Sequence, residues 1–235
     1  MPHPRHAIAW LPWPALLALS GACACGGSSL PLRPGPLQPG RVDCAPSMEC
    51  LPEPDIERSA FTEHMRFGWT LAAESFEVEP PAAPEARAAA DIQAWSEENF
   101  APWLERKTHT IEAARRELDQ AAEESHRQRI MGGAIAGLMY EDVSVVFEAI
   151  PVPEELDDEP EVRGIYHDVQ RGQARPFIEN ARAAYRACAI NGTRPPTMRH
   201  WSRFCAARQE RLPPEDPVGG NAPRDDETQV DVVAD

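Results

Sequence analysis

The stretch PWLERKTHTIEAARRELDQAAEE, residues 102–124, decides the fold of this chain. Its apolar side chains recur at steps of three and four residues, which is the spacing of one face of an α-helix. Charged side chains fall largely between them, on the other faces of the helix. The apolar positions are Trp103, Leu104, Ile111, Ala114, Leu118, Ala121 and Ala122. This pattern predicts an amphipathic helix that Pro102 opens and that packs one face into a core.

Four further segments have helical composition or periodicity. They span residues 84–99, 130–150, 160–188 and 197–212. Pro84 stands where it can start a helix, and Pro151 and Pro153 close the second segment. Pro176 lies inside the third segment, where we expect it to kink or restart the helix. The sequence therefore predicts a mainly α protein, a small bundle of about five helices within residues 55–212.

A segment before these helices allows two interpretations. Residues 67–71 and 75–78 could form two short strands, or they could begin the helical part of the chain. A short hairpin packed on the bundle would still leave the protein mainly α.

The composition predicts that the bundle has flexible segments on both sides. Residues 23–54 are rich in proline and glycine and offer few apolar side chains to bury, which is typical of a tether. Residues 213–235 hold seven acidic side chains against Arg224 alone, which predicts a disordered acidic tail.

A short apolar run near the N-terminus ends at a cysteine. The run from Ile8 to Leu19 is interrupted by two prolines and is too short to span a membrane, which needs roughly 20 apolar residues. Arg5 lies before it, and small residues follow it in Leu-Ser-Gly-Ala-Cys, residues 19–23. This order resembles the signal peptide of bacterial lipoproteins.

The resemblance implies that residues 1–22 are removed and that the thiol of Cys23 carries a diacylglyceryl group. The new amino terminus would usually be acylated as well, so that several acyl chains, palmitate among them, hold the protein in a membrane. Cys25 is the alternative site, and cleavage there would leave an even four cysteines for pairing. The expected location is the bacterial cell envelope, with the outer membrane favoured; an ordinary secretory signal would instead give a secreted or periplasmic protein.

The remaining cysteines fit an oxidising compartment. We expect Cys44 to pair with Cys50 in a small loop. We expect Cys188 to pair with Cys205 as a staple between the last two helices. The spacing of the first pair differs from the C-x2-C of redox and metal sites, which argues against those roles.

The net charge of −15 limits the classes of partner. It argues against nucleic acid, whose phosphates would be repelled over much of the surface. It also argues against electrostatic adhesion to anionic lipid heads. Membrane attachment would then depend on the acyl chains, and the expected partner is another protein of the envelope.

The glycine-rich stretch of residues 132–137 lacks the spacing of a phosphate-binding loop. We interpret it instead as a place where two helices pack closely. Gly133 and Gly137 would admit a bulky neighbour, and bulk at Gly133 would destabilise the fold. The candidate neighbours are Trp95, Trp103 and Trp201.

The polar residues show no pattern of known chemistry. The histidines after residue 23 lie outside the zinc and serine-hydrolase motifs. The acidic run of residues 154–161 lacks the spacing of a calcium loop and is typical of a solvated loop followed by an acidic helix start. The sequence therefore predicts no catalytic residue, no metal ligand and no cofactor.

Two classes of function are compatible with these observations. We favour a non-enzymatic structural or interaction module of a membrane-associated assembly, which should have a closed core and an exposed apolar patch. The alternative is an exported enzyme or small-ligand binder, which should have one deep cleft lined by aromatic and titratable side chains. The residues that such a cleft would use are Trp69, Trp95, Trp103, Trp201, Tyr166 and His200.

Overall fold

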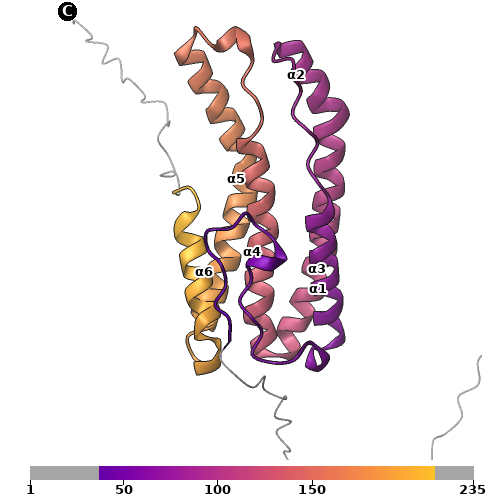
Figure 1. Cartoon of the computed structure of the whole chain (residues 1–235), viewed down its shortest axis with the longest axis vertical. Helices are drawn as coiled ribbons and strands as arrows, with labels where there is room; N and C mark the ends of the chain where they lie inside the picture. Colours follow the sequence, from indigo (N-terminus) through magenta and orange to yellow (C-terminus); the bar gives the residue numbers. More distant parts are fainter. Residues whose placement is uncertain (1–36, 215–235) are drawn as a thin grey trace, which may run out of the picture. The chain divides into compact units, whose positions relative to one another are not determined.

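The computed structural model describes residues 37–214, and within this range the chain is a helical bundle (Figure 1). Helix α4, His126–Glu148, packs against α3, Ala101–Glu124, and α5, Pro160–Asn191. Helix α1, Glu63–Glu77, packs mainly on α3, and α6, Arg199–Arg211, packs mainly on α5. The described residues contain no strand. The predicted mainly α bundle is confirmed.

Helix α4 is the core of the bundle. Ile130, Ile135, Leu138 and Met139 point in different directions around it, and all are fully buried. By length and composition alone α4 could cross a membrane, but 78% of its apolar window is buried among the other helices. A helix that is apolar on every side needs neighbours on every side, and here the other helices supply them.

Of the two interpretations of residues 67–78, the helical one is confirmed: residues 67–77 belong to helix α1, and Val78 is its C-cap. Thr62 caps the helix: its hydroxyl oxygen accepts a hydrogen bond from the amide of Met65 at 3.3 Å. The buried face of α1 is made of Met65, Gly68, Ala72 and Ser75, spaced by three and four residues. Small side chains on this face allow α1 to approach α3 closely.

The predicted helix over residues 84–99 begins at Ala89 and not at Pro84, and from there it forms one continuous helical segment with its neighbour from Pro102. Helix α2, Ala89–Trp95, leads into a π-helical turn, η3, Ser96–Phe100, and this leads directly into α3. Pro102 lies in the first turn of α3 and has no amide hydrogen to donate to the preceding turn. A wider turn at this point accommodates the missing bond without ending the helix. Counted in this way, residues 37–214 contain five helical segments, but not the predicted five, because two predicted helices merge into one and α1 is added.

Helix α5 continues through Pro176 instead of restarting there. Pro176 is on the solvent-exposed side of the helix. The carbonyl that loses its bond belongs to Gly172, and the space beside Gly172 is open. Water can therefore satisfy this carbonyl, which explains why the helix survives.

The structure also corrects the extent of the predicted tether. Residues 37–56, here called the strap, lie against the bundle and include the short helix η1, Met48–Cys50. Cys50 and Ile56 are fully buried. The Nε2 atom of His200, on α6, lies 2.9 Å from the carbonyl oxygen of Glu53. The strap is therefore part of the folded unit, which begins well before residue 55.

Short helical turns occupy the remaining connections. Helix η2 spans Arg58–Ala60, η4 spans Glu154–Leu156, and η5 spans Pro196–Met198. In the connection that contains η4, the amide of Glu154 donates to the carbonyl of Arg87 at 2.8 Å. The predicted signal peptide, both candidate lipidation sites and residues 215–235 of the predicted tail lie outside the described residues.

Candidate interaction site

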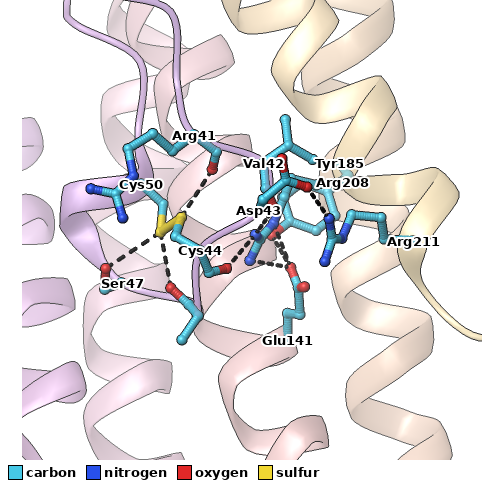
Figure 2. The surroundings of a disulfide bond; sticks show 11 residues. Arg41, Val42, Asp43, Cys44, Ser47, Cys50, Glu141, Tyr185, Arg208 and Arg211 are labelled. Atoms are coloured by element: carbon cyan, nitrogen blue, oxygen red, sulfur yellow. Dashed lines mark hydrogen bonds and ion pairs between the residues drawn. A yellow bond between two sulfur atoms is a disulfide. The ribbon is translucent and has the colours of Figure 1, made fainter.

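A buried polar network joins the strap to three helices (Figure 2). Arg208 of α6 is 1% exposed. Its Nε and Nη2 atoms each lie 3.1 Å from Oε2 of Glu141 on α4. Its Nη1 atom donates to the carbonyl oxygens of Val42 and Cys44, at 2.7 and 2.9 Å. One guanidinium therefore binds both a buried carboxylate and the backbone of the strap.

Tyr185 of α5 completes this network. Its hydroxyl donates to Oε2 of Glu141 at 2.5 Å. Burial raises the pKa of Tyr185 well above its ordinary value of 10, and the charge of Glu141 raises it further against the opposing effect of Arg208. The phenol is therefore neutral at physiological pH and acts as a hydrogen-bond donor to the carboxylate.

The glycines of α4 explain how Tyr185 reaches Glu141. A Cβ atom at Gly137 would overlap the Tyr185 ring, and one at Gly133 would lie 3.1 Å from the carbonyl oxygen of Ala184 and 3.2 Å from Cβ of Cys188. The glycines thus allow close packing of α4 on α5, as the sequence predicts. The bulky neighbour is Tyr185, however, and not one of the tryptophans.

A second buried ion pair connects α3 to α4. Lys107 is 1% exposed, and its ammonium lies 2.6 Å from Oδ2 of Asp142. It also donates to the carbonyl of Ser75 and lies 5.4 Å from the centre of the Phe76 ring. Burial raises the pKa of Asp142, while Lys107 acts in the opposite direction. Lys107 of α3 thus binds a backbone carbonyl near the end of α1 as well as the carboxylate of Asp142 on α4, so it links three helices.

Both predicted cysteine pairs lie at disulfide distance. The Cα atoms of Cys44 and Cys50 are 6.2 Å apart, and those of Cys188 and Cys205 are 6.0 Å apart. The first pair closes a loop of the strap, and the second joins α5 to α6. Cys23 and Cys25 lie outside the described residues.

The polar residues of the acidic loop have structural partners. Both carboxylate oxygens of Glu155 accept from the amide of Ala89, at 3.0 and 3.1 Å, and these bonds lower the pKa of Glu155. Asp157 pairs with Arg87 at 2.6 Å. The acidic run therefore fastens the connection between α4 and α5 onto the start of α2. Among residues 37–214, no group of three or more histidine, cysteine or acidic side chains could hold a metal ion.

The six residues that a cleft would use are not brought together. Trp69 packs on Phe61 and lies beneath Arg58, whereas the indole of Trp103 donates to Val78. The Trp95 indole donates to Ala82 and the Tyr166 hydroxyl to Pro151. His200 and Trp201 are neighbours on α6 and face the strap and the core respectively. Each of these side chains serves a local contact.

An open groove of about 590 Å³ lies between α3 and α5. Ile111, Phe177 and the ring of Tyr140 provide its apolar surface. Arg115 donates to the Tyr140 hydroxyl at 3.0 Å and lies 3.7 Å from Asp119, so its charge is already compensated. The other lining residues are Thr108, Glu112, Arg116 and Asn180.

An exposed apolar row leads along α5 toward this groove. Val162, Ile165 and Val169 are 41%, 59% and 56% exposed. They recur at steps of three and four residues and therefore share one face of the helix. Asn180 lies eleven residues after Val169, which is close to three helical turns, so the same face continues into the groove. We call Val162, Ile165 and Val169 the apolar row.

No protein-family model, curated protein or solved structure matches this chain. The features of this chain that bear on function are the apolar row, the groove and the sequence pattern near Cys23.

Proposed function

We propose that the protein is a lipid-anchored component of the bacterial cell envelope whose bundle is a non-enzymatic interaction module. The observation that carries this proposal is the apolar row of α5. Three branched apolar side chains, each more than two-fifths exposed, stand together on one helix face. The buried charges of the described residues are engaged in holding helices and strap together, as expected of a scaffold.

The spacing of the apolar row indicates the chemistry of the partner. An amphipathic helix presents anchors at the same steps of three and four residues, and it could lie along α5 and enter the groove. The compensated charges of Arg115 and Asp119 at the groove favour an occupant without a strong charge of its own. We therefore expect the partner to offer an amphipathic helix of an envelope protein.

The lipid anchor is supported by the sequence around Cys23 and can be tested separately. We expect the protein to incorporate labelled palmitate in a bacterial host, and Cys23→Ser to abolish both the label and the membrane association. Cys25→Ser is the matched control and should leave them unchanged. A label that persists in Cys23→Ser and is lost in Cys25→Ser would move the site. A protein without label in either case would contradict the anchor.

The interaction is tested by the size of the complex that a mild detergent extracts from native membranes. We expect the protein to migrate as part of a larger assembly, and the double variant Ile165→Ser/Val169→Ser to migrate alone. Arg106→Ser, at an exposed position of α3 outside the lining of the groove, is the control and should stay in the assembly. If the double variant remains in the assembly, the apolar row does not bind the partner.

The groove is the one described feature that favours the alternative function, binding of a small exported ligand. It combines aromatic surface with the amide of Asn180 and the hydroxyl of Thr108. Substitution of Phe177 by alanine would then weaken ligand binding without changing the size of the membrane complex. The opposite result would favour the interaction module.

A further inference from the structure

The first half of α5 has its own chain packed against one face only. On this face the Tyr166 hydroxyl donates to the carbonyl of Pro151, and the Gln170 amide donates to that of Ile150. The connection that follows α4 therefore covers this face. The apolar row lies on another face of the same half and stays exposed within residues 37–214.

Gly172 continues the apolar row. It lies three residues after Val169, so the steps from Val162 onward are three, four and three residues, the heptad spacing of a coiled-coil seam. A Cβ atom at Gly172 would have no neighbour within 4 Å. Glycine weakens the interior of a helix, and no contact within the described chain requires one here. The space beside Gly172 therefore suits a side chain from outside the chain. We call the apolar row and Gly172 together the seam.

The seam is complementary to itself in the antiparallel direction. When Val162 of one copy faces Gly172 of a second copy, Ile165 faces Val169, because Ile165 lies three residues after Val162 and Val169 lies three residues before Gly172. Every position of both seams then has a partner, and the gap at Gly172 receives Val162. A parallel pair would instead place Gly172 against Gly172 and leave a void.

The charges near the seam favour the same direction. Six acidic residues lie between Glu154 and Glu161, at the start of α5 and just before it, whereas Arg171 and Arg175 lie at the other end of the seam. In a parallel pair the two acidic starts would adjoin and repel each other. An antiparallel pair places each acidic start near the arginines of the other copy. Both arginines also have contacts within their own chain, so this effect is one of local charge and not of a new ion pair.

We propose that the partner at the apolar row is a second copy of this chain, with the two α5 helices packed antiparallel along the seam. This inference rests on the interaction module proposed above and names its partner. The contact is short, because the ten residues from Val162 to Gly172 span about 15 Å along the helix axis. It belongs with the small, transient interfaces, and confinement of both copies to one membrane would raise their local concentration.

Disulfide trapping tests the contact and its direction. The full chain with Val162→Cys/Gly172→Cys is purified, placed in neutral phosphatidylcholine vesicles and oxidised by molecular oxygen. We expect far more covalent dimer than the unmodified chain forms. The two new thiols of one copy cannot pair with each other, because they are about 15 Å apart along α5 and a disulfide needs Cα atoms within about 7 Å. Absence of the additional dimer would overturn the proposal.

Val162→Cys alone is the matched control for direction. In the antiparallel pair its two copies are again about 15 Å apart along the helices, so we expect no dimer beyond that of the unmodified chain. As much dimer from this single variant as from the double variant would indicate a parallel pair and would overturn the proposal.

Filling the space beside Gly172 tests the packing of the seam. Gly172→Leu meets open space in its own chain and should fold, but it should exclude Val162 of the second copy. Gly164→Leu is the matched control, because Gly164 is also in open space on α5 but lies off the seam. In the same vesicles, energy transfer between copies labelled with donor and acceptor at the C-terminus should be lost in Gly172→Leu and kept in Gly164→Leu. Equal transfer in the two variants would contradict the seam.

Failure of this proposal can be distinguished from failure of the interaction module. If trapping and energy transfer detect no pair, yet Ile165→Ser/Val169→Ser still leaves the native assembly, the apolar row binds a different protein and the second copy is excluded. If they detect no pair and the double variant stays in the native assembly, both proposals are wrong.

Discussion

Replacement of Arg208 by methionine tests whether the buried network determines the stability of the bundle. Methionine keeps much of the side-chain length and removes the charge and all five donors. Glu141, whose side chain is 11% exposed, then stays in the core without its cation. Removing one partner of a buried ion pair costs about 3–5 kcal/mol. The carbonyls of Val42 and Cys44 also lose their donor, but water can reach this part-buried site and replace it.

The expected loss is therefore about 4 kcal/mol of unfolding free energy, compared with the 5–15 kcal/mol of a typical domain. Urea denaturation followed by far-UV circular dichroism measures it. Arg203→Met, at an exposed position of the same helix, is the control and should change the stability by less than about 0.5 kcal/mol.

A second variant separates the loss of charge pairing from the loss of packing. In Arg208→Met/Glu141→Gln no buried charge is left unpaired, so we expect the double variant to be more stable than Arg208→Met alone. If Arg208→Met lies within about 1 kcal/mol of the unmodified protein, or if the two substitutions add independently, the network does not act as described here.

Three further predictions follow from single contacts. Gly137→Ala should destabilise the protein by about 1–3 kcal/mol in thermal unfolding, because the added methyl group overlaps the Tyr185 ring. Gly172→Ala, where the added methyl group meets open space, should instead stabilise the protein by up to about 1 kcal/mol. Equal effects of the two substitutions would contradict the close packing of α4 on α5. The hydrogen bond to Glu117, 2.7 Å away, raises the pKa of His64 above 6.5, so this pair stabilises the fold below pH 6.5 and the contribution disappears as the pH rises through the folded pKa. An NMR titration should show a lower His64 midpoint in Glu117→Gln, and an unchanged midpoint would exclude the pair as the cause. Burial raises the pKa of Tyr185, so the neutral phenol stabilises the fold up to about pH 10, and that contribution is lost at higher pH. Tyr185→Phe should therefore be destabilised less by alkali than the unmodified protein. Urea midpoints measured on both sides of pH 10 check this.

The bundle could be predicted from the sequence because its long helices repeat apolar residues at a visible period. Helix α1 could not be assigned from the sequence, because its pattern fits two short strands as well as a helix. Its buried face includes Gly68, Ala72 and Ser75, which carry little hydrophobic signal, while Phe67 is 54% exposed. Phe67, Trp69, Thr70 and Phe76 are aromatic or β-branched, and such residues are typical of strands. Packing on α3, and not local composition, decides the structure here.

The candidate site could be predicted only in part. The sequence includes Val162, Ile165 and Val169 in a predicted helix, but periodicity alone does not say whether an apolar face is covered. The sequence also does not indicate that Arg208 binds the strap, because the carbonyl oxygens that accept from it, at Val42 and Cys44, lie 166 and 164 residues earlier. Nothing local distinguishes Arg208 from the other arginines of its helix; only the long-range contact does.

The strap has a consequence for the order in which this protein folds. Residues 42–44 and Glu53 are made early, yet the groups that bind them are on α6, at sequence separations of 147 to 168 residues. Contacts of such long range form late and slow the folding of a domain. During synthesis the strap therefore stays unpaired until the last helix has been made, with its apolar residues exposed to other chains. The appearance of α6 is the moment at which the N-terminal and C-terminal ends of the described chain close into one cooperative unit.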